Sequence, residues 1–421
     1  MTRSITPARP KVAAVTTVWR KDSHADVIIP KLIAGYDLDG EPVTPSVEVA
    51  SLYVDQFPEN DLSRRWAARF GIPIAGSVRE ALTLGGDRLA VDAVLIVGEH
   101  GEYPWNEKGQ HLYPRRELFE QAVNVIRAAG RPVPIFNDKH LSYSWENAKW
   151  MYDTARALGI PFMAGSSLPV TYREPDLDLP LGVHVEEALV LSHGPTESYG
   201  FHALETLQCL VEYRNEGESG VQAVELLHGD AFWRAWDGGR FPHDLFDAAL
   251  AACRHQPGSA PDFFRARPPT RASLPGPHPP VAFIVHYADG LRATLLNLNG
   301  YVSDFAFAAR IVPASPAAEP ARAEVRATAF KLEGKPPRWH FNFLAHHIEQ
   351  FFLTGHSPYP VERTLLTTGT LAALMDAGYE GWWLETPHLA IRYRPPAVPW
   401  RRAQGRSLPP EEVWGFKPED V

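Results

Sequence analysis

Lys139 is the residue of this chain whose position most favours chemistry. It follows a short apolar strand predicted over residues 133–136 and precedes an amphipathic helix predicted over residues 145–158. Ligands of open α/β sheets bind outside the carboxyl ends of the strands, so a lysine there is a candidate for catalysis. An ammonium is costly to desolvate, and a buried lysine can therefore give or take a proton. The neighbouring Asp138 is either the electrostatic partner of Lys139 or a solvated carboxylate.

A histidine is the second candidate for proton transfer. His202 lies near the start of a helix predicted over residues 200–213, where the positive end of the helix dipole favours a neutral imidazole. Its side chain can give or take a proton near neutral pH. Glu197 and Tyr199 are close enough in sequence to share its pocket. The other interpretation of His202 is a packed histidine whose hydrogen bonds are satisfied inside the fold.

Glu99 and His100 follow another apolar strand, predicted over residues 91–97, and stand at a further carboxyl end of the sheet. A carboxylate and an imidazole there could bind a divalent metal or a polar ligand, and His24 and His111 could converge with them. The spacing matches no metal signature, so no metal site is predicted. A polar loop at the rim of a pocket is the simpler interpretation.

The first part of the chain, residues 11–170, alternates strand-like and helix-like segments. The run over 91–97 (VDAVLIV) is largely apolar and β-branched, as a buried parallel strand requires. A β-α-β-α order is the signature of a doubly wound parallel sheet, so this part is predicted to form a Rossmann-like α/β domain. Its other strands are predicted over residues 11–19, 47–54 and 160–164, and its other helices over 25–35, 62–70, 78–82 and 118–129.

The second part of the chain has a different rhythm. Strand-like runs at residues 281–287 and 291–298 are separated by Asp289-Gly290, and adjacent strands joined by a short turn favour an antiparallel sheet. The proline-rich stretch 256–280 is predicted to be a loop or linker, and the chain beyond Pro395 to run over the surface. The remaining strands are predicted over 188–191, 221–227, 305–312, 322–332 and 389–393, and helices over 341–354 and 364–377.

Composition excludes several classes of protein. The net charge of −9, with 41 scattered basic residues, argues against nucleic acid as a partner. The two cysteines, Cys209 and Cys253, are too few for a disulfide scaffold and are expected to be buried free thiols. No signal segment or membrane span is expected, because no apolar segment follows the first residues of the sequence and no apolar run reaches the length of a span. The length of 421 residues predicts two domains, and the protein is expected to be soluble and cytoplasmic.

Four segments, taken in their order, resemble the glucose-fructose oxidoreductase/inositol dehydrogenase (Gfo/Idh/MocA) family. The strand over 91–97 resembles the fourth strand of that family, and residues 137–141 (NDKHL) stand where the family has its Glu-Lys-Pro motif. Residues 200–205 (GFHALE) resemble its Gly-x-His-x-x-Asp helix start, and residues 343–377 its closing helix pair. The resemblance implies a Rossmann-like domain over residues 1–170, an α/β substrate domain with a largely antiparallel open sheet over 171–394, and a tail over 395–421.

The usual chemistry of that family is hydride exchange between NAD(P) and a sugar or cyclitol hydroxyl. The resemblance therefore implies NAD or NADP as cofactor, a small carbohydrate-like substrate, and Lys139 and His202 as catalytic residues. The sheet of such a domain often pairs with another subunit, so a homo-oligomer is expected, with Trp382 and Trp383 as interface candidates. The implied cofactor contacts are Thr16, Thr17, Asp55 and Glu99, and the implied substrate contacts are Asp138, Glu197, Ser198 and Tyr199.

Three departures from the family pattern bear on the redox step. The turn after the first strand, residues 16–24, contains no glycine, although glycines there let the backbone approach a pyrophosphate. Ser198 replaces the aspartate that the family has four positions before the histidine, and His140 replaces the proline of Glu-Lys-Pro. Three hypotheses follow: an NAD(P)-dependent oxidoreductase of a sugar, cyclitol or related polyol; a lyase, hydratase or isomerase acting on a keto-sugar without ordinary dinucleotide binding; or a non-catalytic ligand-binding relative.

Overall fold

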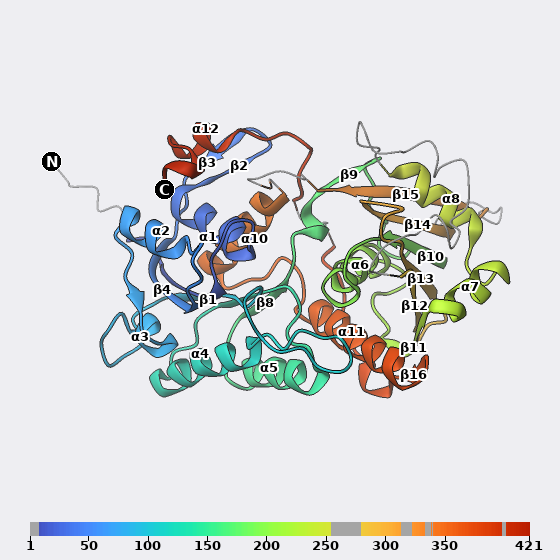
Figure 1. Ribbon diagram of the computed structural model, residues 1–421, viewed down its shortest axis with the longest axis horizontal. Helices are drawn as coiled ribbons and strands as arrows, with labels where there is room; N and C mark the ends of the chain where they lie inside the picture. The colour runs from blue at the N-terminus through green and yellow to red at the C-terminus, as the bar shows by residue number, and fades with distance from the viewer. Residues whose placement is uncertain (1–7, 254–278, 313–321, 333–337, 339, 398–400) are drawn as a thin grey trace.

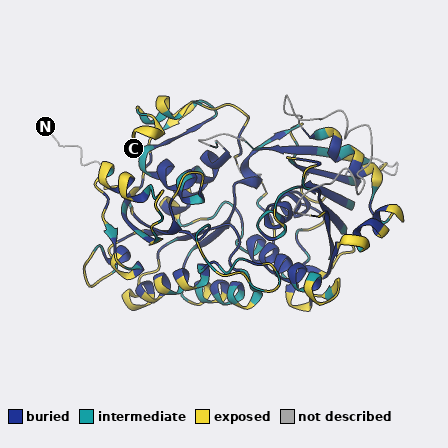
Figure 2. Cartoon of the chain, viewed as in Figure 1, coloured by how far each residue is buried: buried dark blue, intermediate teal, exposed yellow. Residues whose placement is uncertain are grey.

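Two sheets with their covering helices make up the protein. The computed structural model describes residues 8–253, 279–312, 322–332, 338, 340–397 and 401–421. The first sheet and its helices lie on the left of Figure 1, and the second sheet lies on the right. Buried residues concentrate on the strands and on the inner faces of the helices in both units (Figure 2).

The first sheet has six parallel strands in the order β5-β4-β1-β6-β7-β8. This is the strand order of the doubly wound dinucleotide-binding fold. Successive strands are added toward one edge of the sheet from β1 to β5 and toward the other edge from β6 to β8, so the order reverses between β1 and β6. The strand order confirms the predicted Rossmann-like sheet. The strands are β1 (Lys11–Val18), β4 (Glu48–Gln56), β5 (Ile74–Ala75), β6 (Ala93–Val97), β7 (Ile135–Asp138) and β8 (Phe162–Gly165).

Helices cover both faces of this sheet. Because side chains alternate along a strand, Ala13 and Val15 of β1 pack with α3, α4 and α5, whereas Val12 and Ala14 pack with α1 and α10. Helix α10 comes from the second half of the chain and still belongs to the core of the first sheet. The helices are α1 (His24–Ala34), α2 (Ser63–Phe70), α3 (Val78–Thr83), α4 (Arg115–Ala129), α5 (Trp145–Ala157) and α10 (His340–Thr354), and a small hairpin joins β2 (Tyr36–Leu38) to β3 (Glu41–Val43).

The second sheet has eight strands in the order β16-β11-β12-β13-β10-β14-β15-β9. Every pair is antiparallel except β10 with β13, which confirms the predicted, largely antiparallel sheet. The strands are β9 (Tyr172–Glu174), β10 (His184–Ser192), β11 (Val221–His228), β12 (Val281–Tyr287), β13 (Arg292–Asn297), β14 (Phe305–Val312), β15 (Glu324–Lys331) and β16 (Trp383–Glu385).

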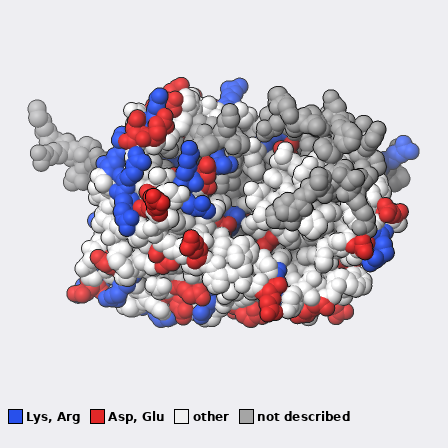
Figure 3. All heavy atoms as spheres, in the orientation of Figure 1, with Lys and Arg blue, Asp and Glu red and all other residues white. Residues whose placement is uncertain are grey.

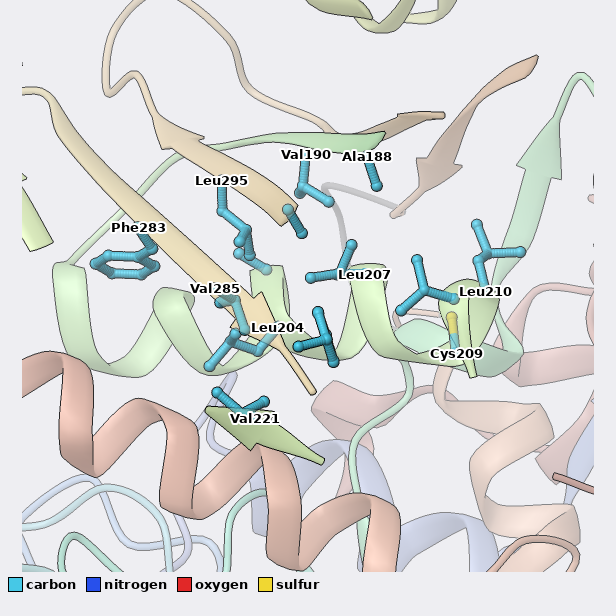
Figure 4. Packing of buried hydrophobic residues seen from close by; sticks show 14 of the residues in the cluster. Ala188, Val190, Leu204, Leu207, Cys209, Leu210, Val221, Phe283, Val285 and Leu295 are labelled. Carbon is cyan, nitrogen blue, oxygen red and sulfur yellow. The ribbon is translucent and has the colours of Figure 1, made fainter. Parts of the chain in front are cut away.

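The second sheet also carries helices on both faces. Val190 of β10 faces α6 (Thr196–Val211) and α11 (Glu362–Glu380), while its neighbours Leu189 and Leu191 face α7 (Gly229–Asp237) and α8 (His243–Ala252). Figure 4 shows Leu204 and Leu207 of α6 beneath side chains of the sheet. This packing fixes the start of α6, and with it Glu197 and His202, against the edge of the first unit.

Several local predictions differ from the structure. The strand predicted over residues 389–393 is wrong, because η2 (Pro387–Leu389) precedes it and Tyr393 makes only an isolated bridge to Glu218. The apolar side chains of residues 389–393 pack into the core of the second unit, and the strand near this segment is β16, which precedes it. Helices α7 and α8 were not predicted. The proline-rich stretch 256–280 lies outside the described residues except for its last two positions.

Residues 401–421 run over the first unit. Within this segment, α12 (Pro410–Trp414) and η3 (Pro418–Asp420) pack near α1 and α2, where Trp414 donates to the Gly35 carbonyl over 2.8 Å. Charged side chains of both signs are scattered over the face seen in Figure 3, with Lys and Arg gathered over α2. Cys209 and Cys253 are buried free thiols, as predicted. No helix in the described parts of the chain is long and apolar enough to cross a membrane.

Candidate active site

A cavity of about 450 Å³ lies outside the carboxyl ends of β1, β6 and β7, between the two units. In a doubly wound sheet this is the position of the ligand-binding crevice, where the strand order reverses. The start of α6 closes the cavity from the side of the second sheet. The polar residues that line it include His24, Glu99, His100, His111, Lys139, Glu197, Ser198, Tyr199, His202 and His340.

Lys139 is fixed at the end of β7 by Glu99, which follows β6. Lys139 Nζ lies 2.9 Å from Glu99 Oε1, and the other carboxylate oxygen accepts from Arg115. Asp138 is therefore neither the salt-bridge partner of Lys139 nor a solvated carboxylate, the two interpretations that the sequence left open, because it is buried and contacts His24. Lys139 has a φ of 61°, a left-handed conformation that is costly for a lysine and that clusters at functional sites. Its amide donates to the Gly165 carbonyl over 2.9 Å, which holds this conformation in place.

Three charges lie together in the buried group around Glu99. Burial alone would raise the pKa of Glu99, but the charges of Lys139 and Arg115 hold it well below its usual range. A Cβ atom at Gly98 would lie 2.8 Å from Arg115 Cγ, so the glycine lets Arg115 approach the end of the strand. The charged form of the carboxylate is thus favoured, and its contact with Lys139 holds that side chain at the wall of the cavity.

His24 and Asp138 form a second pair at the same cavity. Ser23 caps α1 by accepting from the Asp26 amide, and this places His24 in the first turn of the helix. His24 Nδ1 lies 2.6 Å from Asp138 Oδ2, and Asp138 is fully buried. A carboxylate at Nδ1 orients the ring and leaves Nε2 for the cavity that the ring lines.

His202 is neutral and is the first residue of a buried hydrogen-bond relay that continues through Ser166 to Glu205. Burial, assisted by the charge of Lys139, holds the pKa of His202 well below its usual range. Its Nδ1 lies 3.1 Å from Ser166 Oγ, and Ser166 also hydrogen-bonds Glu205 through its hydroxyl and its amide. Burial raises the pKa of Glu205 to about 7. The relay links the cavity to a carboxyl group that can exchange a proton near neutral pH.

Glu197, at the first turn of α6, is the second carboxyl group of this kind. Burial raises its pKa to about 7. Glu197 Oε2 accepts from the His111 amide over 3.1 Å, whereas the buried Oε1 has no hydrogen-bond partner. His140 Nε2 lies 3.8 Å from Oε1, but burial holds the pKa of His140 well below its usual range and leaves that ring uncharged.

The other residues implied by the resemblance are not all brought to the cavity. Ser198 and Tyr199 line it, and the Tyr199 ring meets His202 edge-on at 5.9 Å between centroids. Thr16 and Thr17 are buried, and their hydroxyls donate to the Val97 and Glu99 carbonyls over 3.0 and 2.8 Å. Their side chains therefore tie β1 to β6, and their role as cofactor contacts stays a prediction.

The glycine-free turn does not fill the crevice with its tryptophan. Trp19 is fully buried, stacks on Trp66 at 5.8 Å and donates to Asp26 over 3.2 Å. These contacts hold the Trp19 ring in the core beside α2. The loop that follows β6, residues 98–114, lines the crevice instead.

That loop takes the two places that a dinucleotide would need. His100, with a φ of 69°, puts Nδ1 3.5 Å from the amide of His24, over the helix N-terminus that would face a pyrophosphate. Tyr103 donates to Asp55 Oδ2 over 2.6 Å, and Asp55 stands where the fold carries the acid for a ribose diol. The residues present do not fit a dinucleotide in the ordinary pose of this fold.

Metal binding has no structural support in the described part of the chain. No group of three or more His, Cys, Asp or Glu residues is arranged there to hold a metal ion. His24, His100 and Glu99 lie near one another, but Lys139 and Arg115 engage both oxygens of Glu99, and His100 Nδ1 accepts from the His24 amide.

One of these features was missed by reasoning from the sequence. His24 and Asp138 are 114 positions apart in the sequence, so no local pattern predicts that they pair. A signal did exist, because Ser23 followed by Asp26 is a helix-start pattern directly after a predicted strand. It would have placed His24 at the carboxyl end of β1, at the same edge of the sheet as the carboxyl end of β7.

Comparison with known proteins finds likeness in structure only. No family model matches the chain, and no curated protein matches it. The fold is similar to GenD2 from gentamicin A biosynthesis, solved in complex with NAD, at a TM-score of 0.52 and 15% identity over 90% of this chain and 96% of that one. It is also similar to scyllo-inositol dehydrogenase from Lactobacillus casei, at a TM-score of 0.51 and 10% identity over 90% and 99%.

These structural neighbours carry the fold that the sequence resemblance implies. One of them was solved with NAD and the other is an inositol dehydrogenase, and the likeness extends over nearly the whole chain. The predicted fold class, a Rossmann-like sheet followed by a largely antiparallel sheet, is therefore confirmed. At identities of 10 to 15%, the likeness concerns the fold and leaves the reaction open.

Proposed function

We propose that this protein is a non-redox enzyme that removes a proton from the carbon beside a carbonyl group in a small polyhydroxylated substrate. One observation carries the proposal. His100 and Tyr103 of the chain's own loop contact the His24 amide and Asp55, the groups that would hold a dinucleotide, while the groups that move protons remain assembled around the cavity. The substrate class rests on the fold, which is similar to that of an inositol dehydrogenase.

Lys139 supplies the positive charge that such a reaction needs. Removal of a proton beside a carbonyl places negative charge on the carbonyl oxygen, and a fixed cation aimed at that oxygen stabilises the transition state. Glu99 and the left-handed backbone hold the ammonium at the cavity wall before substrate arrives. This pre-organisation lowers the reorganisation that the reaction requires.

His24 supplies the base. Asp138 binds Nδ1 and thereby keeps a lone pair on Nε2, which is free to accept the proton from carbon. His202 and Glu197 line the same cavity and can return a proton at another atom. A base of this kind contributes about 10² to 10⁴ in rate. The product is then an isomer or the result of an elimination, in line with a lyase, hydratase or isomerase.

The test is hydrogen–deuterium exchange on carbon. A panel of keto-inositols and keto-sugars is incubated with the protein in D₂O, and loss of the proton signals beside the carbonyl is followed by NMR. The wild type is expected to exchange at least one substrate, and Lys139→Met and His24→Gln to lose about 10²-fold or more of that rate. Lys149→Met, on the exposed face of α5, is the matched control. A wild type that exchanges nothing in the panel overturns the proposal.

A second candidate is an NAD(P)-dependent oxidoreductase acting on a sugar, cyclitol or related polyol hydroxyl. The fold similarity to GenD2, solved with NAD, favours it, as does the presence of Lys139 and His202 in one cavity. Calorimetry with NAD, NADH, NADP and NADPH separates the two candidates. Micromolar binding of any of them would support the second candidate and contradict the first.

A homo-oligomer also remains a prediction. Trp382 and Trp383, at the start of the edge strand β16, are half exposed and are the candidate interface residues.

A further inference from the structure

A second cavity, of about 440 Å³, adjoins the first on the side of the second sheet. The two cavities share Trp105, Pro195, Glu197 and Ser198, so the start of α6 and one loop residue form a common wall. Beyond this wall, the second cavity is lined by the apolar and aromatic side chains of Leu226, Met375 and Tyr379 from β11 and α11, and by Glu107 and Lys108 of the loop. Such a lining suits a ring or an alkyl group better than a charged one.

Glu197 is the polar group of this common wall. Its side chain is 5% exposed, and Oε1 is buried without a hydrogen-bond partner. A buried carboxyl oxygen that the protein leaves unpaired is costly unless a ligand or a proton satisfies it. The other oxygen is held by the amide of His111, so the carboxyl group cannot turn freely.

The wall opposite α6 is formed by the loop of residues 98–114, which contacts the second unit. Lys108 pairs with Asp376 of α11, and Tyr379 donates to Glu107 over 2.6 Å. These contacts tie the loop of residues 98–114 to α11, while its other end is tied to β4 by Gln56 and Glu102 over 2.8 Å. Trp105, 60% exposed, stacks on His111 at 4.2 Å and forms a flat aromatic surface between the two cavities.

We propose that the second cavity binds the leaving group of the substrate and that Glu197 gives its proton to the leaving oxygen. This inference rests on the proposed function and narrows it to an elimination. The substrate is then a keto-sugar with an alkoxy substituent two carbons from the carbonyl. Its keto-sugar ring occupies the first cavity, and its alkyl, aryl or glycosyl substituent occupies the second.

The elimination balances without any oxidant. His24 takes the proton from the carbon between the carbonyl and the substituted carbon, and the electron pair of that C–H bond becomes a C=C bond. The C–O bond to the substituent breaks, and its electron pair stays on the oxygen, which takes the proton of Glu197 and leaves as an alcohol. The products are an unsaturated ketone and an alcohol. Burial raises the pKa of Glu197 to about 7, so the acid form is populated near neutral pH.

Leaving groups of different basicity test the role of Glu197. The probes are the methyl and the nitrophenyl glycosides of a keto-glucose whose carbonyl lies two carbons from the glycosidic carbon. Methoxide needs a proton to leave, whereas nitrophenolate does not. Glu197→Gln is therefore expected to lose about 10²-fold or more on the methyl glycoside and less than about tenfold on the nitrophenyl glycoside. Glu117→Gln, an exposed carboxylate of α4, is the matched control and is expected to leave both rates unchanged.

The second cavity is tested by its lining. Tyr379→Ala is expected to raise KM for the nitrophenyl glycoside several-fold without changing that for the methyl glycoside, because only the larger group reaches Tyr379. Equal losses of Glu197→Gln on both glycosides would overturn the role as an acid. Wild-type exchange of the proton beside the carbonyl without release of either alcohol would overturn the inference and leave the proposed function standing. Absence of exchange would overturn both.

Discussion

The Tyr103 hydroxyl donates a hydrogen bond of 2.6 Å to Asp55 Oδ2, and so joins the loop after β6 to the carboxyl end of β4. Tyr53 donates to the other oxygen of Asp55 over 2.8 Å, so both carboxylate oxygens are engaged. In a dinucleotide-binding sheet this acid accepts the hydroxyls of a ribose. In this protein two tyrosine hydroxyls of the chain itself stand in their place.

The first prediction concerns nucleotides. The wild type is expected to bind none of NAD, NADH, NADP or NADPH at millimolar concentration, because ligand would have to displace both Tyr103 and His100. Tyr103→Ala removes the ring that occupies the adenosine side and is expected to show weak, measurable binding of ADP-ribose. Isothermal calorimetry checks both proteins, and Tyr53→Phe serves as the control that frees Asp55 without opening space. Micromolar binding by the wild type contradicts this prediction.

The second prediction concerns Glu99. Glu99→Gln leaves Lys139 and Arg115 buried without a compensating charge. Loss of one partner from a buried ion pair costs about 3 to 5 kcal/mol, so the free energy of unfolding is expected to fall by that amount. Asp153→Asn breaks the exposed pair with Lys149 and is expected to cost about 1 kcal/mol or less. Urea denaturation measures both changes, and equal losses in the two variants would contradict the argument.

Much of the fold was predictable because hydrophobic periodicity is a local property. The apolar run over 91–97 and the segments around it predicted a doubly wound sheet, and β6 lies at Ala93–Val97. The strand predicted over residues 389–393 is wrong because a short apolar segment can pack into the core without pairing as a strand. Tyr393 turns inward to donate to Glu212 over 2.8 Å, so its apolar neighbours pack without a strand partner.

The candidate site was predictable only in part. The rule that ligands bind at the carboxyl ends of strands selected Lys139 and Glu99 correctly as residues of one region. It could not show that Glu99, rather than Asp138, is the partner of Lys139, because side-chain direction depends on the left-handed backbone at residue 139. The contacts of the loop over 98–114 with Asp55 and Asp376 could not be predicted either, because they depend on the path of the loop between the two units.

The third prediction concerns the dependence of stability on pH. The pKa of the fully buried Glu205 is raised from 4.5 to about 7, so the folded state binds its proton more tightly than the unfolded state. The resulting contribution to the free energy of unfolding is complete below pH 4.5 and is lost as pH rises to about 7. Its size is on the order of 3 kcal/mol.

Glu205→Gln tests this dependence. The amide does not titrate, so the variant is expected to lose part of the decline in stability between pH 4.5 and about 7 that the wild type shows. Glu197, whose pKa is also raised to about 7, accounts for a further part with the same sign. Urea denaturation at a series of pH values gives the slopes, with Glu117→Gln as control. Identical slopes in the wild type and Glu205→Gln would show that the carboxyl group is charged throughout.

The last prediction concerns the pair formed by His24 and Asp138. The carboxylate of Asp138 accepts from Nδ1 and is expected to keep His24 in the Nδ1–H tautomer, with the lone pair on Nε2. Asp138→Asn preserves the shape of the side chain but can donate to Nδ1, and the tautomer is expected to reverse. Nitrogen chemical shifts of the imidazole ring report the tautomer directly. Exchange of the substrate proton beside the carbonyl is expected to fall about 10²- to 10⁴-fold in the same variant.

Asp92→Asn is the matched control for this pair, because Asp92 is a half-exposed carboxylate that bonds Arg131 and the Lys11 amide away from the cavity. A purely structural role for Asp138 would lower the free energy of unfolding and leave the tautomer of His24 unchanged. A role as the positioning residue of a base would change the tautomer and the exchange rate together. The two readouts therefore separate support of the fold from orientation of the imidazole, and an unchanged tautomer in Asp138→Asn would remove His24 from the role of base.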